Sequence, residues 1–421
     1  MTQSTLGDLR HPALKALRSL WRAAPLPPAA RGVAGRTVAA VIGARHRRSR
    51  LEGLGVDLKR GPIVVSGFHN EALGIGRGGR LTAQALEDAG YQVIRHDARA
   101  AIQTPGFANV ALPGEGGVWL QHCNAPEAIA LFDRVRREDL FGRYRIGYWA
   151  WELPTAPKDW LRTARFFDEI WTPSQFTADS LAGCGVPVRA MPHPLPDVTA
   201  DPDPARFEFL PGRINFLAMA DLRSSAARKN PLGAVEAFLR AFPEPQAKAA
   251  LTLKLVQSQT DAAAMRALGA RISGRPDIRL LVEEYDADDV LRLLASADVV
   301  LSLHRAEGFG LVPAEALSLG RAALATGWSG NMEFMADLPE ALVPYSLIKA
   351  QDSSGRYRRQ MWADPDLDAA AAQIRLLTED AALRAHIGRK GREAVATLRR
   401  AWSRDALKVL PIDGCAARTR D

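Results

Sequence analysis

The sequence is poor in cysteine, and its few cysteines form no functional pattern. Its 421 residues include three, Cys123, Cys184 and Cys415, which stand far apart. Their odd number and wide spacing exclude a disulfide framework and do not match the close ligand pairs of a zinc site. We therefore expect a protein of a reducing compartment, the cytoplasm.

Long apolar runs are also missing. No stretch approaches the roughly 18 to 20 consecutive apolar residues that a membrane-spanning helix needs. The N-terminus lacks the apolar core and small-residue cleavage site of a signal peptide. The sequence thus predicts neither a secreted nor an integral membrane protein.

An even spread of charge is absent as well. The net charge is +8, yet residues 1–60 alone contain twelve Lys or Arg against three Asp or Glu, so the rest of the chain is close to neutral. The basicity therefore belongs to an N-terminal arm, residues 1–59, and does not imply nucleic-acid binding. The amphipathic "LKALRSLWRAA" and the basic "RHRRSR" predict contact of residues 1–50 with an anionic membrane, the inner face of the plasma membrane. A solvated or inter-domain helix is the alternative.

What is present points to a globular protein with two domains. The composition, 47% hydrophobic and 24% charged, is ordinary for a folded chain. A single core rarely grows beyond roughly 250 to 300 residues, so this length predicts two. From residue 60, short aliphatic runs alternate with segments of helical spacing, such as Gly78–Gly90, which is typical of β/α units. The predicted strands are Pro62–Phe68, Tyr91–His96, Gly117–Cys123, Tyr144–Trp151, Glu169–Ser174, Ile214–Ala220, Leu251–Gln257, Ile278–Glu283, Ala297–His304 and Ala322–Trp328.

A proline-rich stretch divides the two series of strands. Pro192–Gly212 contains six prolines, which neither continue a helix nor pair within a sheet. We predict an α/β protein with two doubly wound Rossmann-like domains, residues 60–200 and 201–380, facing a central cleft. Residues 381–421 would form a helix that packs back across both domains, followed by a tail. Ligands of such sheets bind beyond the carboxyl ends of the strands.

One stretch at such a strand end, "LHRAEGFGLVPAEALSLG", places two carboxylates around a tight turn. Gly308 and Gly310 permit the turn that follows Glu307, and Pro313 suits a helix start, so we expect Glu315 in the first helical turn. Free amides at a helix start attract phosphate, and a carboxylate beside them can accept hydrogen bonds from a ribose. Alternatively, Glu315 only complements the helix dipole.

A second stretch, "DLRSSAARKNP", follows the strand that opens the second domain. Arg223, Arg228 and Lys229 are suited to converge on a diphosphate, where guanidinium groups bind two oxygens at once. Such charges in a loop are often merely solvated. Their place at the carboxyl end of a strand favours the binding interpretation.

Together these stretches resemble the retaining glycosyltransferases of family 4. Glu307 and Glu315 are similar to the family's Glu-x7-Glu signature, and Arg223 with Lys229 is similar to its diphosphate-binding pair. The resemblance covers roughly residues 60–400. It implies the two-domain GT-B fold, with Glu307 on the hydroxyls of the transferred sugar, Glu315 on the ribose, and the main-chain amides of Gly308–Leu311 on the donor. The family often has Gly-Arg where this chain has Leu222-Arg223, which leaves Arg228 as an alternative to Arg223.

The resemblance extends to other strand ends. "GIGRGG" looks like the family's glycine-rich loop, with Arg77 reaching an anionic group, and His122 resembles the histidine that faces the donor sugar. "SGNMEF" resembles the loop against the nucleotide base. His193 and Glu152 are further candidates, Glu152 for the acceptor. The predicted catalytic residues are Glu307, His122, Lys229 and Arg223, and the predicted donor-binding residues are Gly76, Arg77, Arg228, Gly308, Phe309, Gly310, Leu311, Glu315, Asn331 and Glu333.

No metal site or cofactor is predicted. Asp-x-Asp triplets begin at Asp201, Asp286 and Asp364, but none directly follows a strand as a metal-nucleotide site would. The resemblance implies hexose transfer, with retention, from a nucleotide-diphosphate sugar to a saccharide or lipid-linked saccharide in bacterial polysaccharide, lipopolysaccharide or exopolysaccharide synthesis. The alternatives are a sugar-nucleotide epimerase of the same architecture and a non-catalytic sugar-nucleotide sensor.

Overall fold

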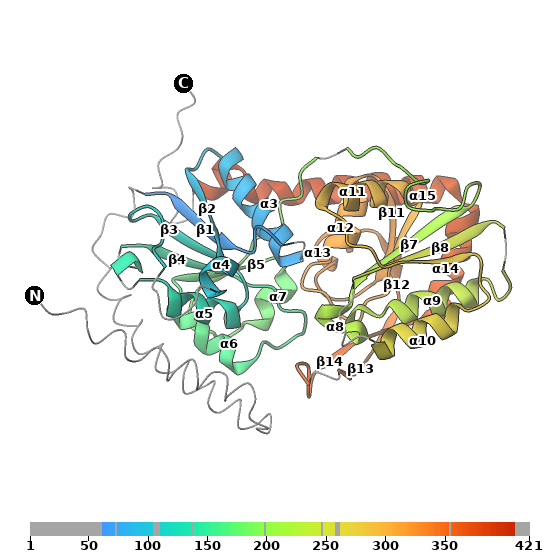
Figure 1. Ribbon diagram of the computed structural model, residues 1–421, viewed down its shortest axis with the longest axis horizontal. Helices are drawn as coiled ribbons and strands as arrows, with labels where there is room; N and C mark the ends of the chain where they lie inside the picture. The colour runs from blue at the N-terminus through green and yellow to red at the C-terminus, as the bar shows by residue number, and fades with distance from the viewer. Residues whose placement is uncertain are drawn as a thin grey trace, which may run out of the picture.

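The computed structural model describes residues 61–408 except 72–73, 104–109, 137, 141, 198, 246, 257–261 and 353–354. The predicted basic arm with its membrane segment, and the predicted tail with Cys415, lie outside the described residues. Two parallel sheets of six strands lie side by side, each flanked by helices (Figure 1). This confirms the prediction of two Rossmann-like domains.

The first sheet forms from the aliphatic runs before the proline-rich stretch, in the order β2-β1-β3-β4-β5-β6. All five residues of β1 and of β3 are buried, as in a parallel sheet with helices on both faces. The strands are β1 (Ile63–Gly67), β2 (Val93–Asp97), β3 (Val118–His122), β4 (Tyr144–Tyr148), β5 (Glu169–Thr172) and β6 (Val188–Ala190). The helices are α3 (Gly74–Asp88), α4 (Ala98–Gln103), α5 (Ala125–Arg134), η2 (Glu138–Leu140), α6 (Lys158–Thr163), η3 (Ala164–Phe166) and α7 (Gln175–Ser180).

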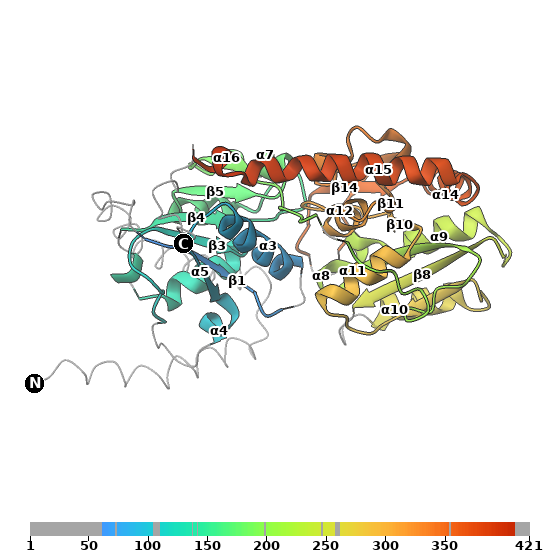
Figure 2. The same ribbon diagram turned by 90° about the horizontal axis from the view of Figure 1, so that it is seen from above.

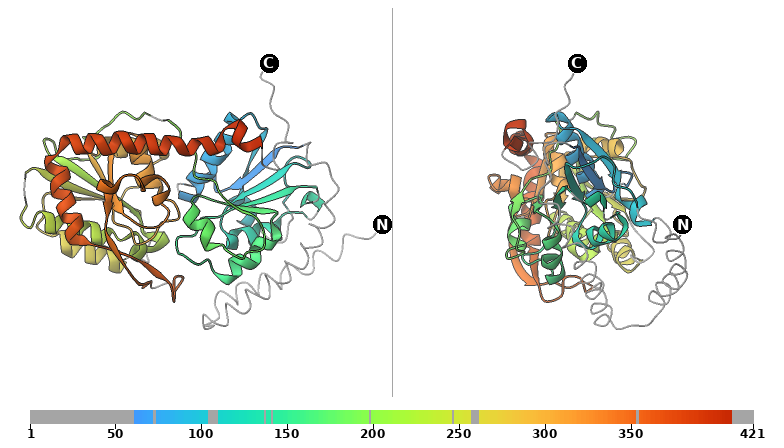
Figure 3. Two further views of the ribbon diagram at one scale, coloured as in Figure 1. Left: turned by 180° about the vertical axis from the view of Figure 1, so that it is seen from behind. Right: turned by 90° about the vertical axis from the view of Figure 1, so that its left-hand side faces the viewer.

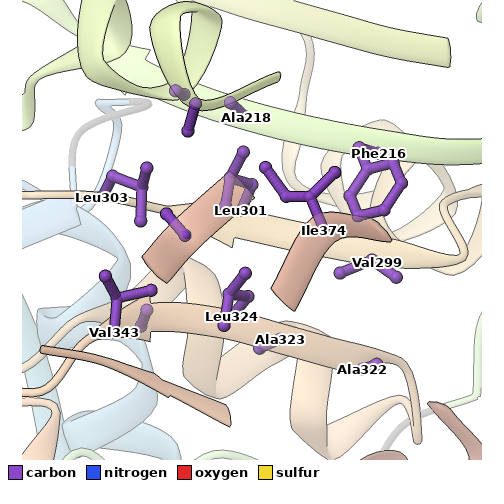
Figure 4. Close-up of a cluster of buried hydrophobic side chains, with 14 of the residues drawn as sticks. Phe216, Ala218, Val299, Leu301, Leu303, Ala322, Ala323, Leu324, Val343 and Ile374 are labelled. Atoms are coloured by element: carbon purple, nitrogen blue, oxygen red, sulfur yellow. The ribbon is translucent and has the colours of Figure 1, made fainter. Parts of the chain in front are cut away.

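The second sheet has the order β12-β11-β10-β7-β8-β9, and Leu301, Leu324 and Ile374 belong to the apolar cluster against it (Figure 4). Its strands are β7 (Ile214–Asp221), β8 (Ala249–Val256), β9 (Ile278–Leu281), β10 (Val299–Ser302), β11 (Ala322–Thr326) and β12 (Leu342–Val343). Its helices are α8 (Leu222–Lys229), α9 (Pro231–Ala241), α10 (Ala262–Ile272), α11 (Ala287–Ser296), α12 (Leu311–Ser318), α13 (Met332–Met335), η5 (Pro339–Ala341) and α14 (Leu367–Glu379).

The strand orders locate where ligands would bind. Successive strands run outward from β1 in one direction and from β3 in the other, and the second sheet reverses in the same way between β7 and β10. At such a switch point the connections leave toward opposite faces of the sheet and open a crevice at the strands' carboxyl ends. The stretches that follow β7 and β10 contain Lys229 and Glu307, so both border the switch point of the second sheet.

The C-terminal helices connect the two domains. α15 (Ala381–Leu398) runs along one side of the molecule from the second domain toward the first, followed by η6 (Arg399–Trp402) and α16 (Arg404–Lys408) (Figures 2 and 3). A Cβ added to Gly391 would lie 2.2 Å from a methyl carbon of Leu317, so glycine allows α15 to approach α12 closely. The Trp402 indole donates to the Pro192 carbonyl at 2.6 Å and packs on Trp171 of the first domain.

A two-stranded hairpin, β13 (Tyr345–Lys349) with β14 (Met361–Pro365), was not anticipated from the sequence. Its strands are antiparallel and belong to neither main sheet. Tyr357 and Trp362 from this hairpin join the apolar cluster of the first domain, and the ring of Tyr357 lies 5.7 Å from that of Trp151. The hairpin therefore bridges the two domains.

The glycine-rich stretch after β1 and the charged stretch after β7 are both helical. The glycine-rich Gly74–Gly79 forms the first turns of α3, and most of Asp221–Pro231 forms α8. In α8 the Asp221 carboxylate accepts from the Arg223 amide at the start, and Asn230, in the left-handed conformation, ends the helix. Between these two ends the backbone of Ser225 is not helical, so α8 is kinked at this residue. The cations predicted to lie on a loop after the strand therefore lie on a short, kinked helix.

Candidate active site

Glu307 lies beyond β10 between two cations of α8. Lys229 Nζ is 2.5 Å from its Oε1, and Arg228 Nη1 is 3.2 Å from its Oε2. Burial alone would raise the pKa of Glu307, but the two cations outweigh it and lower the pKa to about 2. The carboxylate is therefore ionised at neutral pH. Lys229 keeps about a fifth of its side chain exposed and remains accessible to a ligand.

Arg228 is almost completely buried and contacts both domains. Its Nη1 donates to the Ala306 carbonyl at 2.7 Å, and its Nη2 lies 3.5 Å from Glu152 of the first domain. Burial would lower the pKa of Arg228, but Glu152 and Glu307 raise it above its usual value. The guanidinium thus stays charged and is shared between the two carboxylates. With 3% of its side chain exposed, Arg228 is placed to orient Glu307, whereas the predicted direct contact with a donor would need it to be uncovered.

The turn after Glu307 is fixed from several sides. Ser174 Oγ and Thr177 Oγ1 of the first domain donate to the Gly308 carbonyl at 2.6 and 3.2 Å. Gly310 has φ = 91°, a conformation suited to glycine, and a Cβ on Gly330 would lie 2.2 Å from the Gly308 oxygen. The turn leads directly into α12, whose first amides have no partner within the helix. Backbone donors of Gly308–Leu311 are therefore presented beside the Lys229–Glu307 pair.

Glu315 lies in the second turn of α12, not in the first turn where the sequence placed it. Its Oε1 is 3.0 Å from Arg77 Nε of the first domain, so two predicted ligand-binding residues pair with each other across the domain boundary. Burial raises the pKa of Glu315, and Arg77 opposes this only in part. The helix-dipole alternative for Glu315 loses its basis, because that effect is confined to the first turn.

His122 ends β3 beneath the glycines of α3. Its ring stacks on Tyr148 at 4.2 Å, and a Cβ on Gly78 would come within 2.8 Å of it. Neither ring nitrogen of His122 finds a hydrogen-bond partner within the described part of the chain. His193 lies nearby, with Nδ1 3.2 Å from the Tyr148 hydroxyl, and burial lowers its pKa to about 3. Burial also holds the pKa of His122 well below its usual value, so both rings are neutral.

Other predicted residues are placed away from Glu307 or are occupied by structural contacts. Arg223 pairs with Asp221, the last residue of β7, at 2.8 Å and lies 3.6 Å from Glu284, which follows β9. Asn331 is buried and bonded to His304 at 3.1 Å, where its side chain stabilises the loop after β10. The Glu333 carboxylate accepts from the Gln175 amide at 2.8 Å, across the domain boundary.

Several residues around Glu307 were not predicted from the sequence. Ser174 and Thr177 hold the turn, the Ser329 hydroxyl accepts from the Glu307 amide at 2.9 Å, and the Tyr357 hydroxyl is 3.5 Å from Glu152. Ser174 also caps α7, so the sequence around it indicates only the start of a helix. Only long-range packing identifies such residues.

Two observations concern metals and membranes. Within residues 61–408, outside the gaps given above, no group of three or more His, Cys, Asp or Glu could hold a metal ion. Asp286 caps α11, and Asp364 pairs with Arg305 at 3.1 Å. No helix in the described ranges is long and apolar enough to cross a membrane.

Comparisons with known proteins show the family of this chain. The model of the family described as "Family 4 Glycosyltransferase in conflict systems" matches residues 175–404. No curated protein matches the chain.

Solved structures share the fold. Anabaena HepE in complex with UDP and glucose is 13% identical, with a TM-score of 0.56 over 83% of this chain and 99% of that one. An E. coli structure described as trehalose-6-phosphate bound with UDP-2-fluoro glucose is 15% identical, with a TM-score of 0.51 over 72% of this chain and 74% of that one. An apo structure of OtsA is 15% identical, with a TM-score of 0.54 over 82% and 81%.

Proposed function

This chain belongs to the family 4 glycosyltransferases of conflict systems, and from that premise we propose that it transfers a hexose, with retention, from a nucleotide-diphosphate sugar to a hydroxyl acceptor. The observation that supports this best is the cluster of Lys229, Glu307 and the Gly308–Leu311 amides at the switch point of the second sheet. Retention is inferred from the family signature. A bacterial polysaccharide or lipid-linked saccharide is the acceptor that we propose.

The proposed chemistry separates charge, and the cluster is suited to both charges. As the anomeric bond breaks, positive charge develops on the sugar and negative charge on the departing diphosphate. Lys229 and the backbone amides would stabilise the diphosphate, and removing one such preorganised donor typically costs about 3 kcal/mol, or a hundredfold or more in rate. We propose no required metal, since these cations and amides offer the charge that the diphosphate needs.

Glu307 is suited to bind the sugar and unsuited to protonate the leaving group. With a pKa of about 2 it holds no proton to donate near neutral pH. Its ionised oxygens can accept hydrogen bonds from sugar hydroxyls and favour positive charge on the ring. We propose that the departing phosphate takes the proton of the acceptor hydroxyl, so that neither Glu307 nor Glu315 acts as an acid or base.

Glu315 would hold the ribose of the donor. Its present partner is Arg77, and we propose that ribose hydroxyls replace this contact when the donor binds. Arg77 would then be available to the diphosphate. His122, neutral and with unpartnered ring nitrogens, would face the transferred sugar.

A donor panel tests the proposal. A bound ligand raises the melting temperature with its concentration, so a thermal-shift screen of nucleotide-diphosphate sugars identifies the donor. We expect release of free nucleoside diphosphate only when an acceptor is present. Lys229→Met should slow this release about a hundredfold or more, whereas Lys390→Met, which removes an exposed lysine of α15, should leave it unchanged.

The alternatives make different predictions. A sugar-nucleotide epimerase would convert the donor into an epimeric sugar nucleotide without an acceptor. A sensor would bind the donor and release no nucleoside diphosphate, with or without an acceptor. Either result would overturn the proposed transfer.

A further inference from the structure

The hairpin β13–β14 exposes an apolar face close to the candidate active site. Among the described residues six large hydrophobic side chains are exposed, and three of them, Tyr345, Leu347 and Met361, belong to this hairpin. The strand register pairs Lys349 with Met361, and alternation along β13 puts Tyr345, Leu347 and Lys349 on one face. Half of the Leu347 side chain is exposed. The three apolar residues therefore share one face.

The opposite face anchors the hairpin, so the direction of the exposed face is fixed. Trp362 is buried in the apolar cluster of the first domain, where its ring lies 6.0 Å from that of Tyr357. The Ala363 amide donates to the Arg305 carbonyl at 3.0 Å, two residues before Glu307. Figures 1 and 3 show the hairpin on the side of the molecule opposite α15. A surface that contacted the hairpin would lie beside the domain boundary at Glu307.

Exposed cations border the apolar face. Lys349 lies on the face itself, and Arg358 and Arg359 follow on the connection to β14. None of the three forms an ion pair with another described residue. The carboxylate of the same connection, Asp352, accepts from Ser225 Oγ at 2.9 Å. The three cations outnumber this carboxylate, so the border of the hairpin has a net positive charge.

We infer that this hairpin is a docking surface for an anionic membrane. Apolar side chains enter the boundary between headgroups and acyl chains, while lysine and arginine remain at the charged headgroups. A nucleic acid would engage the cations but would leave Leu347 and Met361 without a role. Three apolar side chains are few for a stable protein interface, which takes roughly 20 to 30 residues a side. The N-terminal arm, with its excess of cations, would be repelled by this border.

Vesicle sedimentation of the full chain tests the inference, with phosphatidylcholine vesicles with and without phosphatidylglycerol. We expect binding only to the anionic vesicles. Changing Lys349, Arg358 and Arg359 together to glutamine should weaken it on the order of a hundredfold at low salt, since each cation near a charged surface contributes about fivefold. The double variant Leu347→Ser, Met361→Ser should weaken it about tenfold through lost apolar burial.

Two matched variants separate the hairpin from general effects. Leu376→Ser removes an exposed leucine of α14, and Arg389→Gln removes an exposed arginine of α15. Both should bind like the unaltered chain, and circular dichroism should show every variant folded. Loss caused only by the cation variant would indicate a general polyanion surface, such as one for nucleic acid, and would overturn the inference. So would equal binding by all variants, or no binding by the unaltered chain. None of these outcomes depends on glycosyl transfer.

Discussion

Replacing Arg228 by methionine removes a buried cation that two carboxylates from different domains share. Methionine keeps most of the volume but leaves Glu152 without its cation, and Glu307 with Lys229 alone. Removing one partner of a buried ion pair typically costs about 3 to 5 kcal/mol of unfolding free energy. For domains of 150 to 250 residues this corresponds to a fall in melting temperature of about 5 to 20 °C.

The loss of orientation should appear separately in the kinetics. In Arg228→Met only Lys229 still orients Glu307, so we expect kcat to fall about tenfold or more at a temperature where the variant is folded. Arg275→Met is the matched control, because Arg275 pairs with the buried Asp277 at 2.7 Å elsewhere in the second domain. It should lower the melting temperature similarly and leave kcat unchanged.

Calorimetry and initial-rate measurements on both variants separate the loss of stability from the loss of kcat. Adding Glu152→Gln to Arg228→Met should recover part of the lost stability, because a neutral amide needs no cation. A melting temperature for Arg228→Met equal to that of the unaltered chain would refute the shared-cation argument. Equal losses of kcat in Arg228→Met and Arg275→Met would refute the orienting role.

Three further predictions concern residues near the domain boundary. Arg77→Met should lower the free energy of unfolding by about 1 to 3 kcal/mol, because it leaves Glu315 unpaired. Adding nucleoside diphosphate should recover part of the lost melting temperature. A melting temperature equal to that of the unaltered chain would contradict the pairing. The pKa of His193 is about 3 in the folded chain, below the value near 6.5 in the unfolded chain. Between these two pH values the unfolded chain binds the extra proton. The free energy of unfolding therefore falls by about 1.4 kcal/mol per pH unit as the pH drops from 6.5 to 3. His193→Gln should show a shallower pH dependence in denaturant titrations, and an identical slope would rule the histidine out. Gly330→Ala should abolish transfer, because the added Cβ would lie 2.2 Å from the Gly308 carbonyl oxygen. The control Gly269→Ala, in the middle of α10 where no atom is near, should raise the free energy of unfolding by about 1 kcal/mol. Full activity in Gly330→Ala would contradict the fixed turn.

The sequence predicted the sheets well, because buried parallel strands are continuous apolar runs. Each of the ten predicted strands overlaps an observed one. The short edge strands β6 and β12 and the hairpin were missed, since β6 and β12 have only three and two residues and one face of the hairpin is exposed. A short or half-exposed strand leaves no such run in the sequence.

The candidate site was predictable in its chemistry but less so in its partners. Glu307 and Lys229 follow two strands, β10 and β7, that are neighbours at the switch point. Their positions after these strands were therefore enough to predict that they lie close together. The burial of Arg228 and the pairing of Glu315 with Arg77 depend on how the domains meet. Local spacing contains no information on that contact. The places of Arg223 and Arg228 could likewise not be distinguished, since both follow the same strand.

Proton NMR of the donor sugar during turnover is the most direct test of the central claim. Its anomeric signal reports transfer, epimerisation and anomeric configuration in one spectrum. We predict that the donor signal is replaced, only in the presence of acceptor, by a glycoside signal of the same configuration, and that this fails with Lys229→Met. A glycoside of inverted configuration, or an epimeric sugar nucleotide formed without acceptor, would contradict the account.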